Sequence, residues 1–267
     1  MNQQFDLIII GDSKHGHDAV KNIAGAKNLI KAAFISSTFK NKTTHDYLNV
    51  EYIKDDVILV DYKNRLFGCY LKSGDRLFCT HLVVATGLDY TPLLLNNKPV
   101  PSVFNTTDEI TKQAKHMQAI VIGKNDADVK LAVAVAKKYK HVYFCTDNFT
   151  PEISEANMRK LNSIDNLVIL PNAVLSKVAS VDGALTSVEL SNYASITCSA
   201  IFAKTKSTPA ITFIPDNIIK KDADGYAITA DNLESTVVPK CFITGNCACK
   251  NTKQMNTAMY ETILHDF

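Results

Sequence analysis

Two glycine-containing turns are the features of this sequence whose residue types and spacing could do chemistry. In the first turn, Gly11 and Gly16 occupy the first and third glycine positions of a GxGxxG pattern, directly after the apolar run at 6–10. In the second turn, Gly123 follows the apolar run at 119–122. A glycine turn between a strand and a helix lets backbone N–H groups at the start of the helix bind the pyrophosphate of a dinucleotide. The spacing therefore predicts two dinucleotide-type turns.

Both turns depart from this pattern at the positions that would face the phosphate. Ser13 replaces the middle glycine of the first turn and brings a Cβ into the path of the phosphate, while Lys14 offers a positive charge beside it. In the second turn Asn125 replaces the middle glycine, and the carboxylates of Asp126 and Asp128 suit an anion poorly. Taken alone, these turns are also typical of βαβ units that bind no nucleotide, and both interpretations stay open at this point.

The residues that would hold a ribose also differ between the two units. A carboxylate at the end of the second strand usually binds the ribose hydroxyls. The first unit instead ends in Ser36, whose hydroxyl replaces that contact weakly, and the second ends in Thr146, Asp147 and Asn148. Asp147 could hold an unphosphorylated ribose but would repel a 2′-phosphate, so the sequence disfavours NADPH at the second turn.

Hydrophobic periodicity predicts the elements that must position these turns. The first unit contains a strand, the turn, a helix and a strand at 31–36, and the second unit repeats this plan between 119 and 148. Between them, alternating apolar residues and turn signals at hairpin spacing predict a three-stranded antiparallel meander over 57–87. Further elements are predicted at 151–162 and 252–264 (helices) and at 167–170, 174–181, 187–190, 194–203 and 225–246 (strands). This is an α/β pattern of two βαβ modules, each interrupted by antiparallel strands.

Composition excludes several classes of protein. The chain has 267 residues and a net charge of +2, too small for the electrostatic footprint of a nucleic-acid binder. No apolar run approaches the roughly 18 residues of a membrane span. Seven cysteines without a CxxC, mostly in apolar segments, favour buried thiols in a reducing, cytoplasmic compartment. The CAC at 247–249 lacks a second ligand pair, so no metal site is expected.

Four motifs stand in one order along the chain: HLVVATGLDYTP at 81–92, GKNDAD at 123–128, GYAITADNLESTVVPKCFITGN at 225–246 and TKQMNTAM at 252–259. That order resembles thioredoxin reductase and its two-dinucleotide-domain flavoprotein relatives. The resemblance implies two Rossmann-like domains with antiparallel β-meander insertions: an FAD-type domain at 1–107 and 208–267, and an NAD(P)-type domain at 108–207. It also implies a homodimer.

The resemblance further implies which residues hold the cofactors. It places FAD against Gly11, Gly16, Ala85, Thr86, Gly87, Gly245, Asn246, Lys253, Gln254 and Met255. The turn and strand-end pattern adds Ser13, Lys14 and Ser36 to this cofactor site. It places a second nucleotide against Gly123, Asn125, Asp126 and Asp147.

Two departures from the family bear on mechanism. The redox-active CxxC should lie within 102–118, which contains no cysteine, and the His-Arg-Arg signature of NADPH users is replaced by Thr146, Asp147 and Asn148. Catalytic residues are therefore unassigned. The candidate thiols are Cys247 and Cys249, which the resemblance places beside the flavin at a helix N-terminus, a position that lowers a thiol pKa.

Two functions follow as hypotheses. The first is an FAD-dependent oxidoreductase that does not use NADPH and exchanges electrons with a protein donor or a disulfide-containing acceptor. The alternative is a non-catalytic descendant that uses the same scaffold as a nucleotide sensor or an interaction protein, since the cysteines and several glycines are missing.

Overall fold

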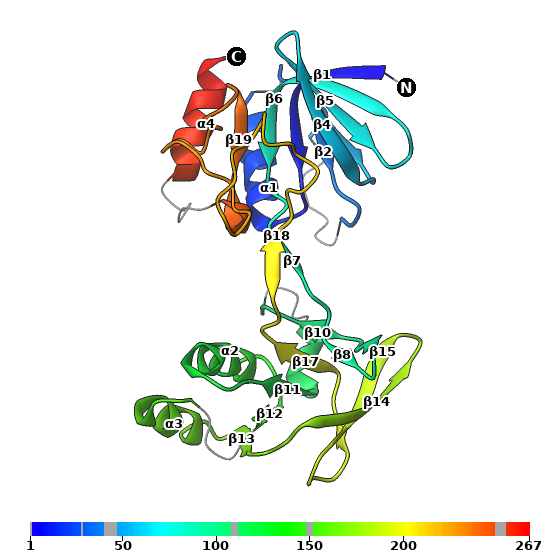
Figure 1. The fold of residues 1–267 in the computed structure, drawn as a ribbon, viewed down its shortest axis with the longest axis vertical. Coiled ribbons are helices and arrows are strands. Elements are labelled where there is room, and N and C mark those ends of the chain that lie inside the picture. The colour runs from blue at the N-terminus through cyan, green and yellow to red at the C-terminus, as the bar shows by residue number, and fades with distance from the viewer. Residues whose placement is uncertain (1, 28, 40–46, 108–111, 148–151, 249–254) are drawn as a thin grey trace. The chain divides into compact units, whose positions relative to one another are not determined.

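The computed structural model describes residues 2–27, 29–39, 47–107, 112–147, 152–248 and 255–267. Contacts within the chain divide it into two compact units (Figure 1). Unit 1 comprises Met1–Asp89 and Ser207–Phe267, and unit 2 comprises Tyr90–Lys206. Each unit contains a parallel sheet flanked by helices, so the predicted α/β class with two Rossmann-like domains is confirmed.

The parallel part of the sheet in unit 1 has the strand order β3-β2-β1-β6, with β19 pairing beyond β6. These strands are β1 (Asn2–Ile10), β2 (Ala32–Ile35), β3 (Val50–Ile53), β6 (Arg76–Val84) and β19 (Cys241–Ile243). All four pairings between them are parallel. The carboxyl ends of β1, β6 and β19 consequently lie at one edge of the sheet, where ligands of such folds bind.

The antiparallel meander extends the same sheet. β4 (Val57–Lys63) pairs with β5 (Leu66–Leu71), and β5 pairs with the first half of β6, Arg76 to Cys79. The second half of β6 pairs instead with β19. The meander predicted over 57–87 is thus confirmed. Its last strand, β6, runs parallel to β1 and ends at the same carboxyl edge of the sheet.

The second half of β1, from Leu7 to Ile10, is buried on both faces, which explains its unbroken apolar run. Leu7 and Ile9 pack against the helical side, formed by α1 (Lys14–Ala19), the π-helix η1 (Val20–Ala24) and α4 (Met255–His265). Ile8 and Ile10 face the opposite way and pack in a cluster with residues of the meander and of the 211–219 segment. The two-residue period of a strand therefore places apolar side chains in two separate cores.

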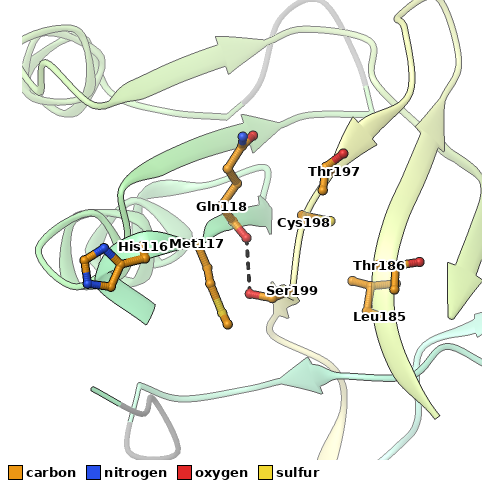
Figure 2. A pocket seen from close by; sticks show the side chains of 8 residues that line it. All are labelled: His116, Met117, Gln118, Leu185, Thr186, Thr197, Cys198 and Ser199. Atoms are coloured by element: carbon orange, nitrogen blue, oxygen red, sulfur yellow. Dashed lines mark hydrogen bonds between the residues drawn. The ribbon is translucent and has the colours of Figure 1, made fainter. Parts of the chain in front are cut away.

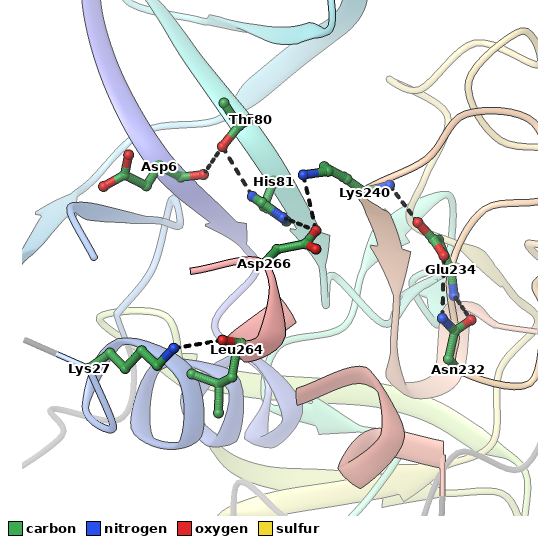
Figure 3. A network of polar contacts seen from close by, with 9 residues as sticks. All are labelled: Asp6, Lys27, Thr80, His81, Asn232, Glu234, Lys240, Leu264 and Asp266. Atoms are coloured by element: carbon green, nitrogen blue, oxygen red, sulfur yellow. Dashed lines mark hydrogen bonds and ion pairs between the residues drawn. The ribbon is translucent and has the colours of Figure 1, made fainter. Parts of the chain in front are cut away.

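The residues after α4 contact a polar cluster around the buried His81 of β6 (Figure 3). The ring of His81 is only 2% exposed; its Nε2 lies 3.0 Å from Asp266 Oδ2 and its Nδ1 lies 3.0 Å from Thr80 Oγ1. Lys240 Nζ contacts the same Asp266 oxygen at 3.0 Å. The ring of Phe267 lies 4.6 Å from that of His81, so this cluster fixes the end of α4 to the sheet.

Unit 2 contains a five-stranded parallel sheet in the order β10-β17-β11-β12-β13. These strands are β10 (Val103–Phe104), β11 (Gln118–Ile122), β12 (His141–Cys145), β13 (Leu167–Leu170) and β17 (Ala200–Ala203). Helices α2 (Asp126–Ala136) and α3 (Glu155–Asn162) pack on one face of it. The antiparallel strands β14 (Leu175–Val181), β15 (Ala184–Leu190) and β16 (Ile196–Thr197) form a second, three-stranded sheet.

Some sequence expectations for unit 2 need correction. Residues 90–107 were expected in the first domain, but β10 pairs with β17 and Val100 is buried in a core of unit 2. The two strands expected at 194–203 do not pair with each other, because β16 continues the hairpin of β15 whereas β17 joins the parallel sheet. Helix α3 begins at Glu155 rather than at 151, since Ser154 is still extended.

The remaining elements are short. β7 (Leu88–Tyr90) pairs with β18 (Ser207–Pro209), β8 (Leu94–Leu95) pairs with β9 (Lys98–Pro99), and η2 (Lys112–His116) and η3 (Gly245–Cys247) are 3₁₀ turns. The strand expected near Gly225 is absent from the described residues, where Ala227 forms only single bridges with Lys221 and Ala248.

Candidate functional site

Glycines bring three chain segments of unit 1 into contact at the carboxyl edge of the sheet. Gly11 has a φ of +107°, and a Cβ there would lie 2.6 Å from the carbonyl carbon of Ala85. A Cβ on Gly16 would collide with the carbonyl oxygen of Gly11. The first and third glycines are therefore required by close packing of the turn against α1 and the end of β6.

The third segment follows β19. Gly245 has a φ of +80°, and a Cβ there would lie 3.1 Å from His15 Nδ1 on α1. The neighbouring Asn246 is exposed, and the Thr244 hydroxyl donates to Asn256 Oδ1 at 2.6 Å. The structure thus places Gly245 beside His15 at the start of α1.

The end of β6 offers polar and open positions to a ligand. Among the described residues, Thr86 Oγ1 is one of few buried side-chain oxygens with no hydrogen-bond partner. Gly87 has a φ of +73° and nothing within 4 Å of the position of a Cβ. A buried hydroxyl without a partner costs free energy, and a bound polar molecule would satisfy it.

Side chains of the first turn contact one another within the chain. Ser13 caps α1 by accepting a hydrogen bond from Gly16 N at 3.3 Å, whereas Lys14 is exposed. The Asp12 carboxylate, 6% exposed, contacts Nε2 of His17, whose side chain is 12% exposed. Asp12 occupies a variable position of the glycine pattern, and no sequence signal indicates its pairing with a residue five positions away.

The other residues expected near a flavin are only partly described. The Ser36 hydroxyl is engaged in its own turn, donating to Thr38 O at 3.1 Å and accepting from Thr38 N at 3.2 Å. Lys253 and Gln254 lie outside the described residues, and Met255 is described only as the first residue of α4.

Cys247 does not have the environment of an activated thiolate. It is fully buried, donates to Thr244 O at 3.3 Å, and burial raises the pKa of its thiol. The expectation that a helix N-terminus lowers this pKa is wrong, because desolvation of the thiolate is the larger effect. Cys249 lies outside the described residues, and the six described cysteines are all buried and free.

The second turn, in unit 2, is organised by its own side chains. Asn125 caps α2 by accepting from Ala127 N at 2.9 Å and from Asp128 N at 3.3 Å. Asp128 Oδ2 accepts in return from Lys124 N and Asn125 N. Gly123 allows Asp128 to approach, since a Cβ there would lie 2.6 Å from Asp128 Cβ.

Asp126 and Asp147 do not join that arrangement. Asp126 Oδ1 accepts from Ser154 N at 2.8 Å, so it holds the start of α3, and hydrogen bonds from Asn157 and Ser154 lower its pKa. Asp147 is exposed after β12. The structure therefore brings Gly123 and Asn125 together with Asp128 and separates Asp126 from the turn's amides.

Unit 2 also contains a shallow cavity of about 330 Å³ away from this turn (Figure 2). It is lined by His116, Met117, Gln118, Leu185, Thr186, Thr197, Cys198 and Ser199. Gln118 begins β11, so the cavity lies at the opposite end of that strand from Gly123. Its one thiol, Cys198, is 3% exposed, and burial raises the pKa of that thiol to about 12.

Metal and membrane sites are not found in the part of the chain that the structure describes. No group of three His, Cys, Asp or Glu side chains there could hold a metal ion. None of the described helices has the length and apolar character needed to cross a membrane.

Comparison with known structures identifies the class of fold. Thioredoxin reductase from Streptococcus pyogenes MGAS5005 matches with a TM-score of 0.65 and 18% identity, covering 99% of each chain. Thioredoxin reductase from T. acidophilum gives a TM-score of 0.65 at 14% identity and 98% of each chain. The bacillithiol disulfide reductase Bdr from Bacillus cereus gives 0.55 at 17% identity, covering 99% of this chain and 100% of that one. The fold is that of thioredoxin reductase.

The family follows from the sequence itself. The profile of the family described as pyridine nucleotide-disulphide oxidoreductase matches residues 37–245, more than half of the chain. The chain therefore belongs to this family. A comparison with curated proteins finds no significant match.

Proposed function

We propose that this protein is an FAD-dependent oxidoreductase of the thioredoxin reductase type that works without an internal CxxC. The observation that carries the proposal is the junction at the carboxyl edge of unit 1. There Gly11 and Gly16 allow close packing of the turn against the end of β6, and Gly245 lies beside the ring of His15. The buried Thr86 hydroxyl has no oxygen or nitrogen partner and lies beside the Cys247 thiol. Side chains would fill this junction, whereas the glycines leave backbone groups facing a ligand.

The proposed cofactor would be held by the backbone of the first turn, by Ala85, Thr86 and Gly87, and by Gly245 and Asn246. These residues fit an extended ligand whose phosphates need close backbone approach and whose sugar hydroxyls need polar partners. The cofactor itself would supply the hydride or electron transfer. The chain would bind and orient it, and Cys247 would pack beside Thr86 as a buried, protonated side chain.

Electrons would enter by a route other than NADPH. The strand end that grips a 2′-phosphate in NADPH users carries Asp147, a carboxylate that repels phosphate. The donor in this proposal is a reduced protein, and the acceptor is a protein or small molecule that contains a disulfide. A cytoplasmic address fits the free thiols, and a homodimer is the assembly we propose from the family resemblance.

The test is the visible absorption spectrum of the purified protein before and after FAD is added and the excess removed. Flavin bands at one FAD per chain support the proposal. The Gly245→Ala variant should lose most of this FAD, because its Cβ meets His15 and the backbone is strained.

Gly183→Ala is the matched control, since Gly183 also has a positive φ, of +78°, but has nothing within 4 Å. It should retain FAD like the wild type. Colourless wild-type protein that takes up no FAD would refute the proposal and favour the alternative, a non-catalytic interaction protein on the same scaffold.

A further inference from the structure

The start of α2 in unit 2 is the position at which a dinucleotide's pyrophosphate would bind. Backbone N–H groups of the glycine turn and of the first helical turn are the donors that such a phosphate requires. In this chain those donors include the amides of Lys124, Asn125, Ala127 and Asp128.

Each of these four amides already has an acceptor within the chain. Asp128 Oδ2 accepts from Lys124 N at 2.9 Å and from Asn125 N at 3.3 Å. Asn125 Oδ1 accepts from Ala127 N at 2.9 Å and from Asp128 N at 3.3 Å. The chain thus satisfies these four amides with one carboxylate and one amide oxygen, in a reciprocal capping box.

The Asp128 carboxylate carries a negative charge and lies where the phosphates of a dinucleotide would bind. Asp128 is 6% exposed, and an isolated buried carboxylate is costly unless hydrogen-bond donors compensate it. The two backbone N–H groups and the positive end of the α2 macrodipole provide that compensation. A pyrophosphate would have to displace Asp128 from these donors and would then face its negative charge.

We propose that the Asp128 carboxylate acts as an intramolecular ligand that occupies the pyrophosphate position of unit 2 and thereby excludes NADH and NADPH. Asn125 assists by capping the remaining amides. This inference rests on the proposed function, in which electrons come from a donor other than NADPH, and it names the residues that prevent nicotinamide nucleotides from binding. Unit 2 then serves as a scaffold in which the side chains of Asp128 and Asn125 occupy the donors of the nucleotide turn.

The experiment measures NADH and NADPH binding by isothermal titration calorimetry. Wild-type protein should show a Kd above about 1 mM for both nucleotides. The Asn125→Gly/Asp128→Ala variant removes the side-chain acceptors of the four amides and should bind NADH with a Kd below about 0.1 mM, a gain of about tenfold or more. Asp128→Asn, which keeps an acceptor oxygen but loses the charge, should show a smaller gain.

Asp126→Asn is the matched control. It also removes one carboxylate charge, two residues before Asp128, but the Asp126 carboxylate accepts from Ser154 N and not from the amides of the turn. It should show no gain. Tight binding by the wild type, no gain in a double variant whose circular dichroism shows a folded protein, or an equal gain in Asp126→Asn would each overturn the proposal.

Flavin absorption measured on the same samples separates this proposal from the proposed function. FAD binding belongs to unit 1, so it should be the same in all four proteins. Absence of FAD from all of them would refute the flavoprotein assignment while leaving the result on Asp128 intact.

Discussion

Replacement of Asp266 by Asn should destabilise unit 1 by an amount that depends on pH. Burial lowers the pKa of His81 below its ordinary value, and the Asp266 carboxylate offsets part of that effect. The folded state therefore binds fewer protons than the unfolded state, so stability falls as the pH drops below about 6.5. Without the carboxylate the His81 pKa falls further, and the loss at acid pH becomes larger.

The magnitude follows from the contacts in Figure 3. At pH 8 His81 is neutral, and Asn retains an acceptor oxygen for it. The main loss is then the partly exposed pair with Lys240, worth about 0.5 kcal/mol. As the pH falls below about 6.5, the variant also lacks the carboxylate that favours a charged imidazole. We therefore expect a loss at pH 5 that is larger than the loss of about 0.5 kcal/mol at pH 8. Hydrogen bonds from His81 and Lys240 hold the Asp266 pKa below its usual range, so it stays ionised there.

Urea unfolding at pH 5, 6, 7 and 8 and constant ionic strength, followed by circular dichroism, measures this difference. Asp216→Asn is the control, because Asp216 pairs with Lys221 at 3.0 Å, and its small effect should not vary with pH. Equal destabilisation by Asp266→Asn at pH 5 and pH 8 would show that the carboxylate does not support a proton on His81.

Three further experiments test the packing of the core. Phe34→Ala should cost about 4 kcal/mol in urea unfolding, because Phe34 is fully buried against the ring of His17, whereas Ile58→Ala at a 57% exposed site should cost under about 1 kcal/mol. Gly16→Ala should lower the melting temperature strongly, since its Cβ collides with Gly11 O; an unchanged melt would contradict this packing. A thiol reagent at pH 8 should leave the six described cysteines unmodified in the folded protein, and more than one reactive thiol per chain would contradict their burial.

Elements with strong periodicity were predictable, and elements defined by pairing across the chain were not. The apolar runs of β1 and β12 and the turn signals of the meander are local features, so the sequence located them. The separation of β16 from β17 depends on partners in β15 and β11, which no local pattern reveals. Residues 90–107 were misplaced for the same reason, since their assignment rests on pairing with β17.

The candidate site shows the same limit. The glycine spacing located both turns, because a positive φ or a close approach is a property of single residues. The pairing of Asp12 with His17 and the capping role of Asp128 depend on where side chains point after folding. The environment of Cys247 was misjudged because sequence position indicates a helix terminus but does not reveal how deeply it is buried.

One edge of β6 is divided between β5 and β19, and this has a consequence for synthesis on the ribosome. β6 ends at Val84, yet β19, which completes the parallel sheet beside it, begins at Cys241. At translation rates of about 5–20 residues per second, roughly 10 to 30 s separate these strands. Unit 2 is continuous and is synthesised within that interval, so it can fold first. During this time the second half of β6 lacks its partner β19, and an unpaired strand edge is a site at which chains can aggregate.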